Sequence, residues 1–366
     1  MKKLKFTYFS LALFILTLVL QVILRSRPTL ALKVYKNGVF DFIRSSYDFL
    51  IGQWLPIPFI LIAVICLLGA LFYHMSLKKR LIPKIFTGIS WILLTLCGFY
   101  FFWGYNYNIP SVRQLIDLKI EAIDSTALYN ELDLVIEEIN EFRSQFQDDS
   151  LPIQYEVGNL ESGIRKDLSN TFHHLGIKIS GKPRVRTLKP KGVLMRFKTA
   201  GIYIPHAFEG HIDGGLLTIE HPFTMAHEMS HAYGITGEGD CNFTAFLACA
   251  SSDDPYFRYS ANLDYSLYLL RDVYRTDKKK HSLIKQKLHP GYTADIRSMI
   301  KNGDKYPDIL PALRDLMYDN YLKSQGISDG IKNYSRIIQM VINYRRIDPS
   351  FLGSSPKEIK SKNLSN

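Results

Sequence analysis

The chain has 366 residues, of which 47% are hydrophobic and 22% are charged, and its formal net charge is +11. The excess lies near the N-terminus: residues 1–110 contain 12 basic and two acidic residues, whereas residues 111–366 contain 33 and 32. A protein that binds nucleic acid would carry its basic excess on the folded domain. We therefore expect no nucleic-acid partner, and we assign the basic excess to the flanks of membrane spans, beside lipid headgroups.

Three uncharged apolar runs predict membrane-spanning helices, at residues 6–24, 54–73 and 85–103. Each is close to the ~20 residues that cross the hydrocarbon core of a bilayer. Lysines precede the first run as in a signal peptide, but the run exceeds the usual ~7–15 apolar residues and lacks a following small-residue cleavage site. We therefore expect a membrane domain with three retained spans at 1–110, a second domain at 111–355 and a polar tail at 356–366.

Basic residues in the loops favour an N-terminus in the cytoplasm. That side would contain seven basic residues, four of them in or next to the compact loop before the third span, against five on the opposite side. Cytoplasmic loops carry the excess of Lys and Arg in membrane proteins. An odd number of spans then places the C-terminal domain outside the cytoplasm.

Beyond the spans the pattern predicts a mainly α fold with a small β element. Apolar residues at 128–146 recur at intervals of four and three, after a cap at Asp124 or Ser125, which predicts a helix. A second helix is predicted at 160–175, ended by Gly176.

The small β element is expected just before a candidate metal site. Residues 201–205 and 216–220 are rich in β-branched and aromatic side chains, and the turn-rich stretch 211–215 separates them. This pattern predicts two antiparallel strands. An exposed strand edge at this point could hold an extended peptide by main-chain hydrogen bonds.

Residues 222–234 contain the pattern His-Glu-x-x-His, formed by His227, Glu228 and His231. Pro222 suits the first turn of a helix and Gly234 suits the residue after the last turn. Side chains four apart share a helix face, so the two imidazoles can bind one metal ion, with Glu228 beside a metal-activated water. This is the arrangement of zinc metallopeptidases. An ordinary amphipathic helix without chemistry is the alternative interpretation.

A third metal ligand is expected after Gly234. A histidine six residues after His231, as in metzincins, is excluded because position 237 is Gly. Asp240 opens the next predicted helix on the face turned towards the first, so we favour it as the ligand, with Glu238 as the alternative. A carboxylate that only stabilises the helix N-terminus would explain Asp240 without a metal. The sequence also offers unranked donors for an oxyanion: His206, His211, His221, Tyr259 and Tyr334.

The chain resembles a family of uncharacterised bacterial membrane proteins. The matching stretches are residues 102–107, 201–205, 222–234, 240–249, 257–260 and 320–323. The resemblance implies three N-terminal spans in the bacterial cytoplasmic (inner) membrane and an extracytoplasmic domain with a zincin-like helix. In the family pattern a Glu begins the helix that Asp240 begins here.

Together these features predict a membrane-anchored zinc metallopeptidase that cleaves peptide bonds of a peptide or protein substrate. Zn2+ would be bound by His227, His231 and Asp240 or Glu238, and Glu228 would act as general base. Two alternatives remain open: a non-catalytic scaffold or envelope assembly module that retains the metal helix, and a metal-dependent amidase acting on cell-wall material.

Overall fold

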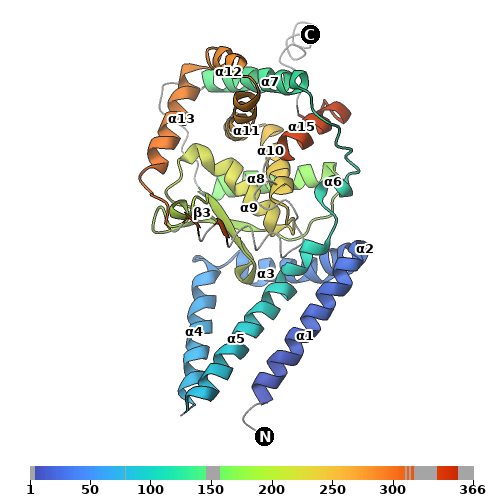
Figure 1. Cartoon of the computed structure of the whole chain (residues 1–366), viewed down its shortest axis with the longest axis vertical. Helices are drawn as coiled ribbons and strands as arrows, with labels where there is room; N and C mark the ends of the chain where they lie inside the picture. Colours follow the sequence, from blue (N-terminus) through green and yellow to red (C-terminus); the bar gives the residue numbers. More distant parts are fainter. Residues whose placement is uncertain are drawn as a thin grey trace.

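The computed structural model describes residues 5–78, 80–145, 157–309, 311–312, 315–316 and 336–352. The fold is mainly helical, with one small sheet. Three long helices project from one end of the molecule, and the small sheet lies in the part of the helical domain that is nearest to them (Figure 1). The predicted polar tail at 356–366 lies outside the described residues.

The three long helices are apolar enough to cross a membrane: α1 (Lys5–Ser26), α4 (Phe59–Ser76) and α5 (Leu81–Phe102). α1 packs along α5, and α4 also contacts α5. The N-terminus lies at the end of these helices that is far from the helical domain (Figure 1). The three predicted spans are therefore confirmed as candidate spans, with different ends.

The ends of the second and third helices differ from the prediction for local reasons. α4 begins at Phe59 rather than at residue 54, because Pro56 and Pro58 keep the residues before them out of the helical conformation. α5 ends at Phe102, so Trp103 lies outside the helix. The Trp103 side chain is thereby available to the domain above.

A helical segment lies between the spans and the domain, and we call it the junction helix (residues 28–52). It consists of α2 (Pro28–Leu30), a π-helical stretch (Ala31–Phe40), α3 (Asp41–Tyr47) and a second π-helical stretch (Asp48–Gly52). One face, including Tyr35 and Arg44, is buried. The other exposes Phe42, Phe49 and Leu50, whose exposed fractions are 72%, 76% and 68%. The segment is thus amphipathic, with its polar side towards the domain.

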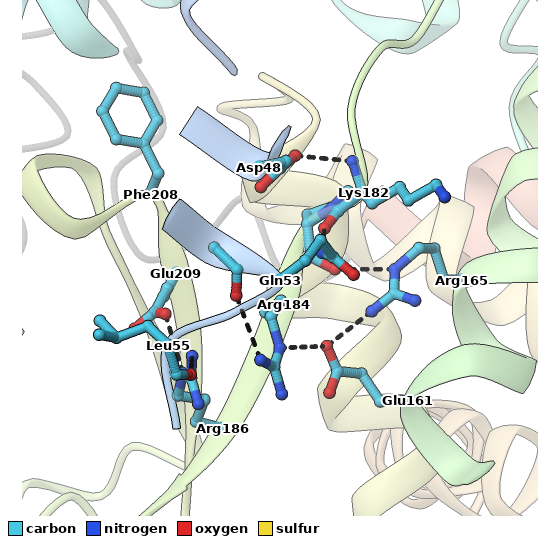
Figure 2. A network of polar contacts seen from close by, with 12 residues as sticks. Asp48, Gln53, Leu55, Glu161, Arg165, Lys182, Arg184, Arg186, Phe208 and Glu209 are labelled. Carbon is cyan, nitrogen blue, oxygen red and sulfur yellow. Dashed lines mark hydrogen bonds and ion pairs between the residues drawn. The ribbon is translucent and has the colours of Figure 1, made fainter. Parts of the chain in front are cut away.

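Arginines from buried ion pairs donate hydrogen bonds that join the junction helix and the residues after it to the sheet (Figure 2). Arg44 pairs with Asp48 at 2.5 Å (Nη2–Oδ1) and also donates to the carbonyl of Phe208. Arg186 pairs with Glu209 at 2.8 Å and donates to the carbonyl of Leu55, which follows the junction helix. Removing one partner of such a buried pair costs about 3–5 kcal/mol. The domain and the membrane-proximal segment are therefore one packed unit.

The sheet has three strands in the order β1-β3-β2, namely β1 (Arg184–Leu188), β2 (Gly201–Ile204) and β3 (Glu209–Asp213). β3 is antiparallel to β2 and parallel to β1. The predicted strand at 201–205 is confirmed. β2 is an edge strand, because among the described strands it pairs only with β3.

The second predicted strand, at 216–220, is wrong: this stretch ends in a 3-10 turn (Thr218–Glu220), and β3 occupies part of the predicted turn. The chain reverses earlier, at the hairpin tip Pro205–Phe208, where Phe208 adopts a φ of +53°. It leaves the sheet at Asp213, whose carboxylate accepts backbone N–H groups of Gly192, Leu194, Met195 and Gly215. Such side-chain bonds to the backbone favour a turn over a longer strand.

The remaining helices form the domain: α6 (Val112–Leu115), α7 (Ser125–Ser144), α8 (Val157–His174), α9 (His221–Ala232), α10 (Glu238–Ala250), α11 (Pro255–Thr276), α12 (Lys278–Lys285), α13 (Pro290–Gly303) and α15 (Arg336–Ile347). The predicted helices at 128–146 and 160–175 correspond to α7, capped by the Asp124 side chain, and α8. α9 packs against α10, α8 and the sheet. The helix with the two histidines is therefore central.

Candidate metal centre

α9 begins and ends beside residues that favour helix termini. Pro222 lies in the first turn, where its missing N–H leaves no hydrogen bond unmade. Gly234 follows the helix with a φ of +96°, and its N–H bonds the carbonyl of His231 at 2.8 Å. Between these ends the rings of His227 and His231 lie on one face, with centroids 4.9 Å apart.

Glu238, the first residue of α10, brings a carboxylate to these two rings. Its Oε2 is 3.1 Å from His227 Nε2, and its Oε1 is 3.6 Å from His231 Nε2. One ligand atom from each of the three residues lies within 4.8 Å of the other two. The side chains are 13%, 9% and 15% exposed, in the order His227, His231, Glu238, so the cluster reaches the surface. We call these three residues the metal cluster.

The outer nitrogen of each ring is held by another group. His227 Nδ1 is 2.7 Å from Asn242 Oδ1, and His231 Nδ1 is 2.8 Å from the carbonyl of Ile235. Because both partners accept hydrogen bonds, they favour a proton on Nδ1 and leave Nε2 free to bind a cation. Histidines that ligate metals are usually oriented in this way.

The electrostatic interactions within the metal cluster favour the binding of a cation. Burial alone would raise the pKa of Glu238, but His231 and His227 hold that pKa well below its usual value. Burial alone would lower the pKa of His231, but Cys241 and Glu238 raise it well above the usual value. The cluster therefore stabilises positive charge between its imidazoles and its carboxylate, and two nitrogens with one carboxylate oxygen are a donor set that fits Zn2+.

Asp240, our favoured third ligand, is not in the cluster, whereas the alternative, Glu238, is. Asp240 Oδ2 instead accepts the N–H of Val112 at 3.1 Å, in the first turn of α6. Burial raises the pKa of Asp240 to about 6. The difference comes from the start of α10: the helix begins at Glu238, whose longer side chain spans the gap to α9, and Asp240 two residues later points towards α6.

Glu228 lies beneath the sheet beside the cluster. Its side chain is buried, and Oε2 has no hydrogen-bond partner among the described residues. Gly201 and Gly210 allow this approach, since a Cβ atom at Gly201 would lie 2.5 Å from Glu228 Oε1 and one at Gly210 would lie 2.9 Å from Glu228 Cβ. Burial raises the pKa of Glu228 to about 7. The carboxyl is thus held next to β2 and can exchange a proton.

Two of the five suggested oxyanion donors, His206 and Tyr259, are bonded elsewhere. His206 Nε2 bonds the carbonyl of Thr95 in α5, His211 is fully buried in β3, and the hydroxyl of Tyr259 donates to Asp295. His221 begins α9, more than one turn before His227. Tyr334 lies outside the described residues. His206 and Tyr259 are therefore held by groups outside the metal cluster.

Several supporting residues were not anticipated from sequence. Asn242 and Gly201 have partners that are distant in sequence, so no local pattern signals them. Trp103 is similar: its indole N–H donates to the carbonyl of His231 at 3.0 Å, and the two rings are 6.2 Å apart. A metal-cluster residue is thus held directly by the residue that follows a candidate span.

Replacing Gly234 with Ala is expected to destabilise the protein by about 1–2 kcal/mol, because a Cβ is unfavourable at positive φ. It would also lie 2.9 Å from Lys36 Cε of the junction helix. Thermal unfolding of the full chain in detergent measures the effect. Gly303→Ala is the matched control, since nothing lies within 4 Å of its added Cβ. Equal stability of the two variants would contradict the positive φ of Gly234 and its close contact with Lys36.

Replacing Asn242 with Ala is expected to weaken zinc binding about 10- to 100-fold, the usual effect of removing a group that orients a ligand histidine. Competition with a chelator of known affinity measures this change. Cys249→Ala is the matched control, because Cys249 is equally buried in α10 but contacts the carbonyl of Pro222 at the far end of α9. Equal affinities for the two variants would show that Asn242 does not orient His227.

The fold and the cluster define a class: a protein with three candidate membrane spans and a helical domain that carries a His-His-Glu cluster. The model of a family described as "Protein of unknown function (DUF3810)" matches residues 35–342. The chain belongs to this family. No curated protein and no solved structure matches it.

Proposed function

We propose that the protein is a membrane-anchored zinc metallopeptidase. The observation that carries this proposal is the convergence of one ligand atom each from His227, His231 and Glu238 within 4.8 Å, with Glu228 next to His227 on α9. An amphipathic helix without chemistry would not require two imidazoles with oriented outer nitrogens facing one ionised carboxylate. These three residues would hold the zinc ion.

Zinc, when bound, acts as a Lewis acid towards a carbonyl and lowers the pKa of water. Glu228 would take a proton from the attacking water on its carboxylate and pass it to the leaving amine. The absence of a described partner for Oε2 leaves one oxygen of that carboxyl free for this role. Asn242 and the carbonyl of Ile235 would keep the two imidazoles oriented while this proton moves.

The domain is zincin-like in this proposal. An exposed strand edge beside the metal helix can hold an extended peptide as an added strand. Here β2 would supply that edge, since its first residue, Gly201, lies against the Glu228 carboxyl. An extended peptide along β2 would then place one of its bonds beside Glu228 and the metal cluster.

We infer that the domain faces the outside of a bacterial cytoplasmic (inner) membrane. The N-terminus and the domain lie at opposite ends of the three long helices (Figure 1), and the counts of basic residues favour a cytoplasmic N-terminus. Alkaline phosphatase fused after Asn366 is expected to be active, because this enzyme requires export. Activity of a cytoplasmic reporter, such as β-galactosidase, at the same position would reverse the orientation.

The peptidase proposal is tested on the purified full chain, because the junction helix is packed against the domain. Metal analysis should find one zinc per chain, and zinc-dependent cleavage should appear in a panel of unfolded proteins and cell-wall peptides. Cleavage of cell-wall amides alone would favour the amidase alternative. Stoichiometric zinc with no cleavage of either class would favour the scaffold.

A further inference from the structure

We propose that the metal centre acts at the bilayer surface, on the segment of a membrane protein that lies just outside its own membrane-spanning helix. This inference rests on the proposed peptidase function and adds the class of substrate. The supporting observations are the position of α9 on the end of a span, the depth of the β2–β3 hairpin and the exposed apolar face beside it.

The last turn of α9 contacts the residue that follows α5. Trp103, the first residue after α5, donates its indole N–H to the carbonyl of His231, and that carbonyl also accepts the N–H of Gly234. Trp103 is buried at this contact, and it directly follows the last residue of the candidate span. A residue of the metal cluster is thus one hydrogen bond from the residue that directly follows a candidate span.

The hairpin that follows β2 reaches along the side of α5. His206 Nε2 is 3.0 Å from the carbonyl of Thr95, and the rings of Phe208 and Phe102 have centroids 5.3 Å apart. Thr95 lies eight residues before Trp103, which corresponds to about 12 Å along a helix axis. The hairpin tip Pro205–Phe208 therefore lies below Trp103, at the level of the upper part of the spans (Figure 1).

β2 connects these two levels. It begins at Gly201 beside the Glu228 carboxyl and continues through Ile204 into the hairpin tip beside α5. Its outer edge is unpaired among the described strands. A peptide that extends along this edge would therefore run from the metal cluster towards the bilayer, as a segment emerging from a neighbouring span does.

The surface around the hairpin suits contact with lipid. Phe42, Phe49 and Leu50 of the junction helix are exposed, and Trp54 beyond it is 78% exposed. Aromatic and aliphatic side chains on one face of an interfacial helix bury in the headgroup region. When these exposed side chains are buried in the headgroup region, the packed domain holds the metal centre at a fixed, short distance above the membrane.

The test uses the full chain in liposomes with internally quenched nonapeptides of degenerate sequence. The peptides are free in solution or joined to a transmembrane leucine–alanine helix through Gly-Ser spacers of about 3, 10 or 40 residues, which bracket the reach of a flexible chain. Glu228→Gln protein reports the background. If the site lies at the surface, a longer spacer lowers the effective concentration of the peptide at the site. The peptide on the 10-residue spacer should therefore be cleaved about tenfold faster than the peptide on the 40-residue spacer.

Two results would overturn the inference and leave the peptidase intact: faster cleavage with the 40-residue spacer, as for a site far above the bilayer, or free peptides cleaved as fast as anchored ones. Absence of Glu228-dependent cleavage from every peptide, free or anchored, by zinc-loaded protein would overturn the proposed function itself.

Discussion

Glu228→Gln protein is expected to retain one zinc per chain and to lose at least about 100-fold in amide cleavage, the range of effects for a general base. Gln has the same shape but cannot accept the proton. It also keeps the contacts with Gly201 and Gly210 that hold the side chain beneath the sheet. Single-turnover cleavage of the substrate found with the panel, together with metal analysis, measures both properties.

Glu137→Gln is a suitable control, because Glu137 is an exposed carboxylate on α7 and is not part of the metal cluster. Glu137→Gln protein should cleave the substrate as fast as the unchanged chain. If Glu228→Gln protein cleaved the substrate within about threefold of the unchanged chain, Glu228 would not be the general base, because a base contributes far more than this.

Glu238→Ala protein is expected to bind zinc more than about 100-fold more weakly, since loss of a direct ligand should exceed the 10- to 100-fold effect of an outer group. Asp240→Ala protein should keep its zinc affinity. Asp240 is the matched control, because it is a half-buried carboxylate in the same helical turn, like Glu238, and it accepts the N–H of Val112. Its loss should cost about 1 kcal/mol of stability instead.

Chelator competition and thermal unfolding of the two variants separate these effects. The opposite result would be an Asp240→Ala protein that cannot hold zinc and a Glu238→Ala protein with unchanged affinity. It would identify Asp240 as the third ligand. Equal loss in both variants would indicate that the first turn of α10 acts as a unit.

The elements that follow from local patterns could be predicted. The spans depend on uninterrupted apolar composition, α7 on a cap and a regular apolar stripe, and α9 on Pro222 and Gly234 at its ends. The pairing of His227 with His231 needs only helix geometry. These features are encoded by neighbours in sequence, and therefore a single sequence suffices to find them.

The elements that depend on distant partners could not be predicted. β3 contains Glu209, His211 and Asp213, which do not read as a strand, yet it is buried between β1 and β2. The choice between Glu238 and Asp240 depended on where α10 begins and how far each side chain reaches. Trp103 reads as the last residue of a span, and its bond to His231 joins residues 128 positions apart.

The most direct test of the account is zinc X-ray absorption spectroscopy on the purified, zinc-loaded full chain. We predict first-shell nitrogen and oxygen at about 2.0–2.1 Å, with the multiple-scattering pattern of two imidazoles, and no sulfur. Cys241 makes the sulfur result informative, because its Sγ lies 3.3 Å from His231 Nδ1. A zinc–sulfur shell at about 2.3 Å, or a chain that binds no stoichiometric zinc, would contradict the proposed centre.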